Sequence, residues 1–351
     1  MYLKDLSSVS PQVTYTEEFI NGDYKIYSKN ILSVIEPSYS EIIPASLLRR
    51  MGKAVRMGIG AALPLIERNE KINGIVMGTA NGGLENCINF LNQIIEYDEG
   101  VLTPTHFVQS TPNALAGQLA LMSKNTGYNV THVNGPLAFE NAILDAMMFL
   151  EGASNKTSLL LGAVEEISNY NYNIDLIAGR YKLENIANND LITSQTNGSI
   201  CGEGATMFIV SNDVNDALAK IINLKQINFP NQINLEQLLN QFLIENDLIP
   251  DDIDLLILGN NGDVQFDSWY VLLRSFFPAT MEYVYYKNFV GEFRTNSAFA
   301  LFFATQLLNG RFHNHKGIQG NFRNTPKTIL IYNQFEGIHH SFILVQSPEP
   351  E

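Results

Sequence analysis

Cysteine is scarce in this chain, which has only Cys87 and Cys201 among its 351 residues. Two cysteines without a paired spacing exclude a disulfide framework and offer too few ligands for a thiolate metal site. We therefore expect no metal and no cofactor, and we place the protein in a reducing, cytoplasmic compartment. A hydrophobic content of 45% is sufficient for a large core, in which both cysteines are expected to lie.

Positive charge and long apolar runs are scarce as well. The chain has 22 Lys and Arg against 36 Asp and Glu, a net charge of -14, which excludes a broad basic face for nucleic acid. No apolar run approaches the roughly 20 residues of a membrane span. Lys4 and Asp5 interrupt the start of the chain, so we expect no signal peptide. The composition predicts a soluble protein that binds neither nucleic acid nor membrane.

Apolar strand-like and helix-like segments alternate along two halves of the chain. Short apolar runs predict strands at 74–77, 158–161, 205–210, 253–258, 327–332 and 341–345, and longer segments predict helices at 139–150 and 234–245. Asn234 is the expected N-cap of the second of these helices. The polar stretch from Ser211 to Ala219 separates the halves, so we predict domains 1–211 and 219–351. Such alternation favours a mostly parallel sheet with helices on both faces.

Four segments occur in the order in which one enzyme family has them. They are a glycine turn at Gly78 to Glu85, a Pro-Asn segment at Phe107 to Gly117, Gly162 to Glu166, and Gly202 to Ala205. Together they resemble the β-ketoacyl-acyl carrier protein synthases, although this chain is shorter than a usual member. The resemblance implies an α/β, thiolase-like fold, duplicated into five α-β-α-β-α layers with mixed, mostly parallel sheets. It also implies a dimer.

Active members of that family condense acyl units with one cysteine and two histidines. The cysteine lies at the N-terminus of a helix, where free amides and the helix dipole favour a thiolate. The family's pattern aligns that cysteine with Pro136, just before the predicted helix at 139–150. Proline has no nucleophilic atom and no amide hydrogen. Both the covalent step and one local hydrogen-bond donor are therefore expected to be absent.

The two histidines are also replaced. The first aligns with Gly259, while Asp267 keeps a distal aspartate of the same motif. The second aligns with Glu292, in a segment that retains the family's lysine as Lys287. A carboxylate at this place repels a developing enolate, and loss of one neutral oxyanion donor already costs about 2.7 to 4 kcal/mol. We therefore expect no catalytic residues for condensation and interpret the chain as a pseudoenzyme.

None of the following histidines is an obvious replacement for the missing catalytic residues. His339-His340 follow Phe335, which resembles the family's gating phenylalanine, and adjacent side chains on a strand point to opposite faces. At most one of the pair faces the site, and packing is the expected role of both and of His132. His313-x-His315 lacks a third ligand, so a solvated loop is expected there rather than a zinc site.

The densest basic cluster contains Arg49, Arg50, Lys53 and Arg56. A solvated helix face is the ordinary interpretation of such a charge run. The resemblance supports a second interpretation, because basic residues at this place in similar synthases contact the acidic acyl carrier protein or flank its docking surface. Both interpretations stay open at this point.

The resemblance and the lost residues together favour a chain-length-factor-like subunit in fatty-acid, polyketide or aryl-polyene-type biosynthesis. Its partner would be a catalytically active ketosynthase, whose acyl tunnel it shapes. Gln109, Ser110 and Thr111 are the best tunnel or interface candidates, and Phe139 and Phe335 are expected to line the vestigial site. Two alternatives remain: an enzyme with altered chemistry on carrier-bound acyl groups, such as a decarboxylase, hydrolase or acyltransferase that uses Glu292 or His340, and a homodimeric acyl-binding scaffold.

Overall fold

A computed structural model describes residues 1–40, 42–69, 72–312 and 315–348 of the protein. The helices are α1 Ala45–Leu48, α2 Lys53–Arg68, α3 Leu84–Glu96, α4 Pro104–Gln109, α5 Ala114–Ser123, α6 Ala138–Glu151, α7 Asn169–Ile177, α8 Gln232–Ile244, α9 Asp267–Ser275, α10 Lys287–Val290 and α11 Ser297–Leu308, with short 3-10 turns η1 Gly135–Leu137, η2 Asn188–Asp190, η3 Pro250–Asp252 and η4 Val264–Phe266. The strands are β1 Tyr2–Val9, β2 Ile31–Leu32, β3 Gly74–Gly78, β4 Tyr128–His132, β5 Ser158–Glu165, β6 Cys201–Gly202, β7 Gly204–Ser211, β8 Ala219–Asn228, β9 Leu255–Leu258, β10 Glu282–Tyr285, β11 Gly320–Asn321, β12 Thr328–Phe335 and β13 His339–Gln346. None of the described helices is long and apolar enough to cross a membrane.

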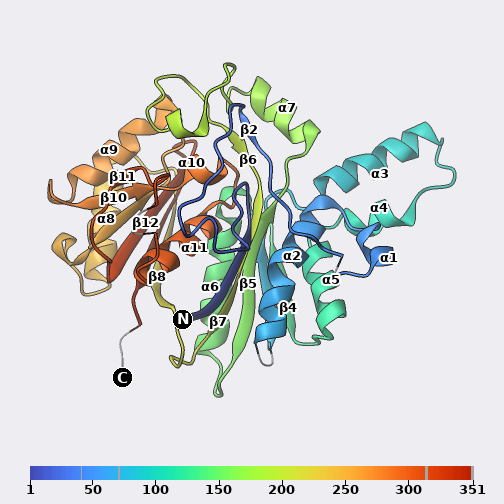
Figure 1. Cartoon of the computed structure of the whole chain (residues 1–351), viewed down its shortest axis with the longest axis horizontal. Coiled ribbons are helices and arrows are strands. Elements are labelled where there is room, and N and C mark those ends of the chain that lie inside the picture. The colour runs from blue at the N-terminus through green and yellow to red at the C-terminus, as the bar shows by residue number, and fades with distance from the viewer. Residues whose placement is uncertain (41, 70–71, 313–314, 349–351) are drawn as a thin grey trace.

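The sheet contains the same strand pattern twice (Figure 1). Its order is β11-β10-β9-β12-β13-β8-β1-β7-β5-β3-β4. The order is β4-β3-β5-β7-β1 in the first half and β10-β9-β12-β13-β8 in the second half. When the long strands of each half are numbered along the chain, both orders read third, second, fourth, fifth, first. In both halves the fifth strand runs antiparallel to its neighbours, and the other pairs are parallel. The repeated order is the mark of a duplicated fold.

The two halves are joined into one sheet where β1 meets β8. Tyr2 and Leu3 pair there with Lys220 and Ala219 in antiparallel register. The predicted pair of sheets is thus continuous through a short central contact. The domain boundaries 1–211 and 219–351 remain a prediction.

Five layers follow from the three large hydrophobic clusters of the described residues. One cluster packs α2 and α5 on the outer face of the first half-sheet, and a second packs α8 and α9 on the outer face of the other half-sheet. The largest cluster holds α6 and α11 between the two half-sheets (Figure 1). Successive side chains of a strand point to opposite faces of the sheet, so one strand contributes side chains to the hydrophobic clusters on both faces. The predicted thiolase-like, five-layer fold is confirmed.

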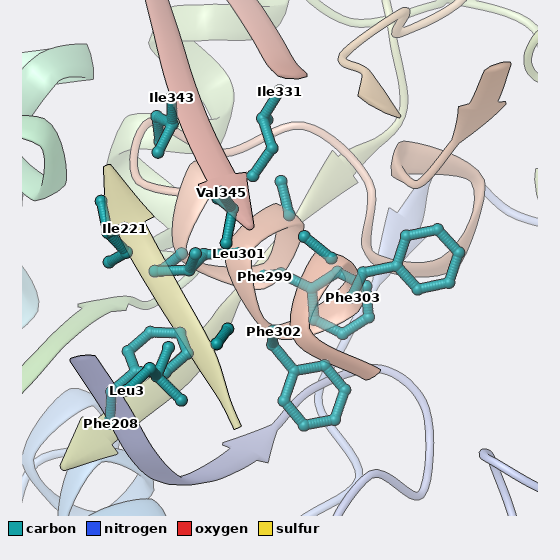
Figure 2. Packing of buried hydrophobic residues seen from close by; sticks show 14 of the residues in the cluster. Leu3, Phe208, Ile221, Phe299, Leu301, Phe302, Phe303, Ile331, Ile343 and Val345 are labelled. Carbon is teal, nitrogen blue, oxygen red and sulfur yellow. The ribbon is translucent and has the colours of Figure 1, made fainter. Parts of the chain in front are cut away.

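Helix α11 lies at the centre of the molecule, and each of its residues is buried. Figure 2 shows its side chains Phe299, Leu301, Phe302 and Phe303 among residues of both half-sheets, including Phe208 and Ile343. A helix that is apolar on all sides is stable only when every side has a partner. The position of α11 between two sheets provides those partners.

The predicted N-cap of helix α8 was wrong by one turn. The helix begins at Gln232, and the Oδ1 atom of Asn231 accepts a hydrogen bond of 2.8 Å from the backbone N–H of Asn234. Both asparagines suit a cap by residue type, but only Asn231 has the extended backbone that a cap requires. Asn234 is therefore the third residue inside the helix.

Candidate functional site

Glu292 lies at the centre of a buried polar network. Lys287, the last basic residue before it, is fully buried and places Nζ 2.8 Å from Glu292 Oε2. Asn261 Nδ2 donates to the same oxygen at 2.8 Å, and Asn296 Nδ2 donates to Oε1 at 2.6 Å. Burial lowers the pKa of Lys287, and the adjacent carboxylate opposes this shift. Both carboxylate oxygens are thus engaged by the protein itself.

Gly259 faces the same network, and Asn333 fills the space where its side chain would be. A Cβ atom at position 259 would overlap Asn333 Oδ1 and stand 3.2 Å from the Tyr286 hydroxyl oxygen. That hydroxyl donates to Asn296 Oδ1 at 2.8 Å, and Asn296 binds Glu292. The structure therefore brings Gly259 and Glu292 into one polar network, in which the Asn333 side chain stands where a Cβ at position 259 would be.

Pro136 lies in the turn η1, which packs against β13 and leads into α6. One turn further, the carboxyl group of Glu140 is fully buried and accepts a hydrogen bond of 2.9 Å from Ser341 Oγ. Burial raises the pKa of Glu140, while Ser297, Ser341 and Lys287 act in the opposite direction. The start of α6 thus reaches the Lys287 network through Glu140. The sequence patterns above did not single out this residue, although a carboxylate one turn after Pro136 on an apolar helix was a usable signal.

Phe139 lies in the hydrophobic cluster between the half-sheets. Its side chain is fully buried, and its ring centroid is 6.0 Å from that of Phe208. It packs as a core residue in this conformation. Its place in an acyl tunnel remains a prediction.

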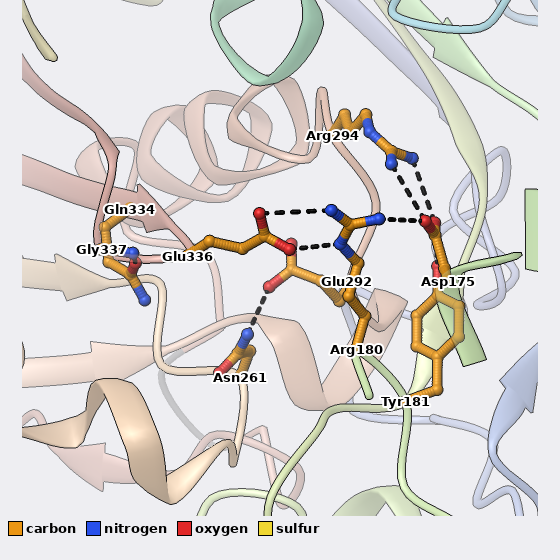
Figure 3. Close-up of polar contacts among 9 residues, drawn as sticks. All are labelled: Asp175, Arg180, Tyr181, Asn261, Glu292, Arg294, Gln334, Glu336 and Gly337. Carbon is orange, nitrogen blue, oxygen red and sulfur yellow. Dashed lines mark hydrogen bonds and ion pairs between the residues drawn. The ribbon is translucent and has the colours of Figure 1, made fainter. Parts of the chain in front are cut away.

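A pocket of about 170 Å³ lies beside Glu292 (Figure 3). Asn261, Glu292 and Phe335 are among the residues that line it. The predicted gating phenylalanine is thus on the wall of a real cavity, with the Arg294 guanidinium 5.5 Å from its ring centroid.

Charged residues stand along the same pocket. Asp175 accepts from Arg294 at 3.2 Å and from Arg180 Nη1 at 2.6 Å, so one buried carboxylate serves two guanidinium groups. The remaining nitrogens of Arg180 bind Glu336, which follows Phe335 (Figure 3).

Gln109, Ser110 and Thr111 lie at the end of a projecting pair of helices. Helix α3 has no buried residue, and α3 with α4 extends from the body of the molecule (Figure 1). Gln109 is buried, Ser110 is half-buried and Thr111 is exposed. The pair exposes a set of large apolar side chains, namely Leu91, Ile95, Tyr97, Val101, Phe107 and Val108. Apolar side chains exposed on one projecting element make it a candidate interaction surface.

The basic cluster is divided by the fold. Arg56 binds Glu36 through two hydrogen bonds of 2.7 and 2.8 Å, and Lys53 binds the buried Glu203 at 2.5 Å. Arg49 and Arg50 are exposed and form no ion pair within the described part of the chain. The cluster is therefore not one continuous face, because internal carboxylates already bind half of it.

His340 is a buried core residue. Its Nδ1 atom lies 2.8 Å from the Tyr332 hydroxyl, and its ring packs edge-on against Trp269 with centroids 4.7 Å apart. Burial lowers the pKa of His340 to about 4. The ring is therefore neutral at physiological pH and held by packing.

The other histidines and the cysteines differ in part from the expectations. His315 is buried against Phe19, so the prediction of a solvated loop was wrong for it, while His313 lies outside the described residues. His132 lies 2.8 Å from Asp145. Cys201 is buried, and burial raises the pKa of its thiol to about 12. Cys87 is only half-buried, because α3 projects from the body.

The comparisons with known proteins agree with this architecture. Residues 30–176 match the family model of the β-ketoacyl synthase N-terminal domain. The structure is similar to an ishigamide ketosynthase/chain length factor, with a TM-score of 0.78, 12% identity and coverage of 99% of this chain and 98% of the other. It is also similar to a β-ketoacyl synthase from Burkholderia phymatum STM815, with a TM-score of 0.77, 15% identity and 99% of both chains covered. A search of curated proteins finds no match.

Residues 30–176 thus match the N-terminal domain of β-ketoacyl synthases, and the whole chain has the thiolase-like fold of the similar ketosynthase structures. Within that fold it is similar to a ketosynthase in complex with its chain length factor from Xenorhabdus doucetiae. That similarity has a TM-score of 0.74 at 13% identity and covers 99% of this chain and 97% of the other.

Proposed function

We propose that this protein is a non-catalytic, chain-length-factor-like subunit that pairs with an active ketosynthase and shapes its acyl tunnel. The observation that carries the proposal is the network around Glu292. Lys287, Asn261 and Asn296 occupy its carboxylate, and Asn333 occupies the space beside Gly259. Gly259 and Glu292 align with the family's two histidines in sequence, so these contacts support a role without condensation.

No described side chain supplies the missing nucleophile. Pro136 has no reactive atom, and the Cys201 thiol is buried with a pKa of about 12, so its thiolate is not available at neutral pH. Cys87 lies on the projecting helix α3 rather than in the Glu292 network. Mass spectrometry after incubation with malonyl or acyl carrier substrates should detect no added acyl mass. A stable adduct on Cys87 or Cys201 would refute the loss of chemistry.

The surface of α3 and α4 supports a thiolase-fold partner. Its exposed apolar side chains are costly in water, and a complementary subunit would bury them. The edge strand β4 lies on the same half of the molecule and has no strand on its outer side within the described sheet. Structures similar to this one contain a ketosynthase with its chain length factor, and a ketosynthase with its acyl carrier protein. We extend both kinds of partner to this chain, with Arg49 and Arg50 as the carrier contact.

The pocket beside Glu292 supports a second candidate, an enzyme with altered chemistry on carrier-bound acyl groups. Glu292 borders the pocket, so a ligand can approach it. Its carboxylate is held by Lys287, however, and a general base must release that contact before it accepts a proton. Hydrolysis or decarboxylation of an acyl-carrier substrate that is lost in Glu292→Gln would favour this candidate.

Co-expression with the ketosynthase from the same gene neighbourhood tests the first proposal. We expect a heterodimer by size-exclusion chromatography with light scattering. The Gln109→Trp or Thr111→Trp variant should shorten the partner's product, whereas Thr280→Trp, a substitution at an exposed position, should leave its length unchanged. A protein that stays monomeric at micromolar concentration, without exchange into a heterodimer, contradicts the subunit role. A stable homodimer would favour the acyl-binding scaffold.

A further inference from the structure

The guanidinium group of Arg180 is held rigidly at the pocket beside Glu292. The backbone N–H of Arg180 donates to the backbone carbonyl of Asp175 at 2.9 Å, and the backbone carbonyl of Arg180 accepts from the backbone N–H of Ser199 at 2.9 Å. Its side chain donates through Nη1 to Asp175 at 2.6 Å. The backbone contacts hold residue 180 in place, and the Nη1 contact to Asp175 leaves the other two guanidinium nitrogens facing Glu336.

Those remaining nitrogens, Nε and Nη2, bind the carboxylate of Glu336. Glu336 lies in the turn between β12 and β13, with a positive φ of 55°, a conformation that is costly for a glutamate. Glu336 lies between Phe335 and Gly337 in the chain. Both Arg180 and Glu336 border the cavity, and Figure 3 shows their side chains in contact. A side chain from a short turn thus occupies the open edge of a preorganised guanidinium group.

Two arginines and two carboxylates form the ion pairs at this end of the pocket, and Asp263 lines it as well. Arg180 and Arg294 carry two positive charges, and Asp175 and Glu336 carry two negative charges. Glu292 is neutralised separately by Lys287. Without Glu336 these ion pairs retain one unpaired positive charge on Arg180, whose free guanidinium edge fits a carboxylate or phosphate.

We propose that Arg180 is the receptor of an oxyanion site in which Glu336 acts as an internal, displaceable occupant. The ligand is a small molecule with a carboxylate or phosphate group, whose short body enters the cavity of about 170 Å³ beside Phe335 and Glu292. Binding exchanges one charge-assisted hydrogen-bonded pair for another and moves the turn at Glu336 away from Arg180. The site is therefore closed by its own carboxylate until a competing anion arrives.

Isothermal titration of the purified chain with malonate, acetate and inorganic phosphate at low salt tests this proposal. Glu336→Gln keeps the size of the side chain and removes its charge, so it should bind at least one of the anions about tenfold more tightly than the wild type. Glu245→Gln removes a carboxylate from the surface pair with Lys225 and is the matched control. It should bind as the wild type does.

The double variants Glu336→Gln with Arg180→Gln, and Glu336→Gln with Arg180→Lys, identify the receptor. Both should lose the gained affinity, because lysine keeps the charge but lacks the planar edge. Near-ultraviolet circular dichroism checks that each variant is folded. A preference for malonate indicates a carboxylate ligand, and a preference for phosphate indicates a phosphate ester. Equal affinities of the Glu336→Gln variant and wild type for all three anions, or full binding by a double variant, would overturn the proposal. Because the chain is titrated alone, the outcome does not depend on partnership with a ketosynthase.

Discussion

The buried pair of Lys287 and Glu292 leads to a quantitative prediction. The two charges are 2.8 Å apart, which corresponds to a gross attraction of about 6 kcal/mol at an effective dielectric constant near 20. Both groups also lose hydration, so the net contribution of the pair is much smaller. Removal of one partner is a different matter, because it leaves an uncompensated charge in the core. Lys287→Met should therefore lower the free energy of unfolding by about 3 to 5 kcal/mol.

Glu292→Gln should be less damaging, and its cost should depend on pH. Burial already lowers the pKa of Lys287, and removal of the carboxylate should lower it further. A lysine whose pKa is lower in the folded state binds fewer protons there than in the unfolded chain. Stability of this variant should therefore rise with pH, relative to the wild type, from its lowered folded pKa up to the ordinary lysine value near 10.5.

A double-mutant cycle in urea measures the coupling. The chain has a single tryptophan, Trp269, which packs on His340 and reports unfolding by its fluorescence. The combined variant of Lys287→Met and Glu292→Gln should be more stable than the sum of the single effects predicts, by about 1 to 3 kcal/mol. Single effects that add within about 0.5 kcal/mol would refute the reasoning, because the two side chains would then not stabilise each other.

Three further predictions follow from other parts of the structure. Because burial lowers the pKa of His340 to about 4, its protonation opposes folding, and stability should fall by up to about 3 kcal/mol as pH drops from 6.5 to 4. Gly259→His should destabilise the fold through overlap with Asn333, and the combination with Asn333→Ala should recover part of the loss in a thermal melt. Charge reversal of Arg49 and Arg50 should weaken binding of an acyl carrier protein more at low salt than at high salt, measured by titration at two ionic strengths.

Each of these three tests has a control. Burial raises the pKa of Glu165 to about 7, so protonation of Glu165 stabilises the fold as pH falls and opposes the effect of His340. The contribution of His340 is therefore measured as the difference in pH dependence between wild type and His340→Phe. An identical pH dependence of these two proteins would refute it. No recovery in the double variant at Gly259 would show that Asn333 is not the obstacle. Charge reversal at the exposed Lys316 and Arg323 should not affect carrier binding, and an equal loss there would indicate a purely nonspecific effect.

The linear sequence was sufficient for the class of fold and for the residue types on which the proposed loss of condensing chemistry rests. Strand β9, Leu255–Leu258, is continuously apolar because both faces of its sheet are covered, and this signal is local. The absence of an imidazole at Gly259 and of a thiol at Pro136 is likewise a matter of residue type. No tertiary contact is needed to conclude that a side chain lacks a reactive atom.

Tertiary structure alone decided what surrounds Gly259 and Glu292 and which charged side chains are already paired. Asn333 is far from Gly259 in sequence, and it fills that space because β12 lies beside β9 in the sheet. Arg56 and Lys53 looked equivalent to Arg49 and Arg50 until Glu36 and Glu203 were found beside them. The contact between Arg180 and Glu336 joins residues far apart along the chain. Such pairings depend on how two halves of a duplicated fold pack, and the free energy of a charge depends on the neighbours that packing supplies.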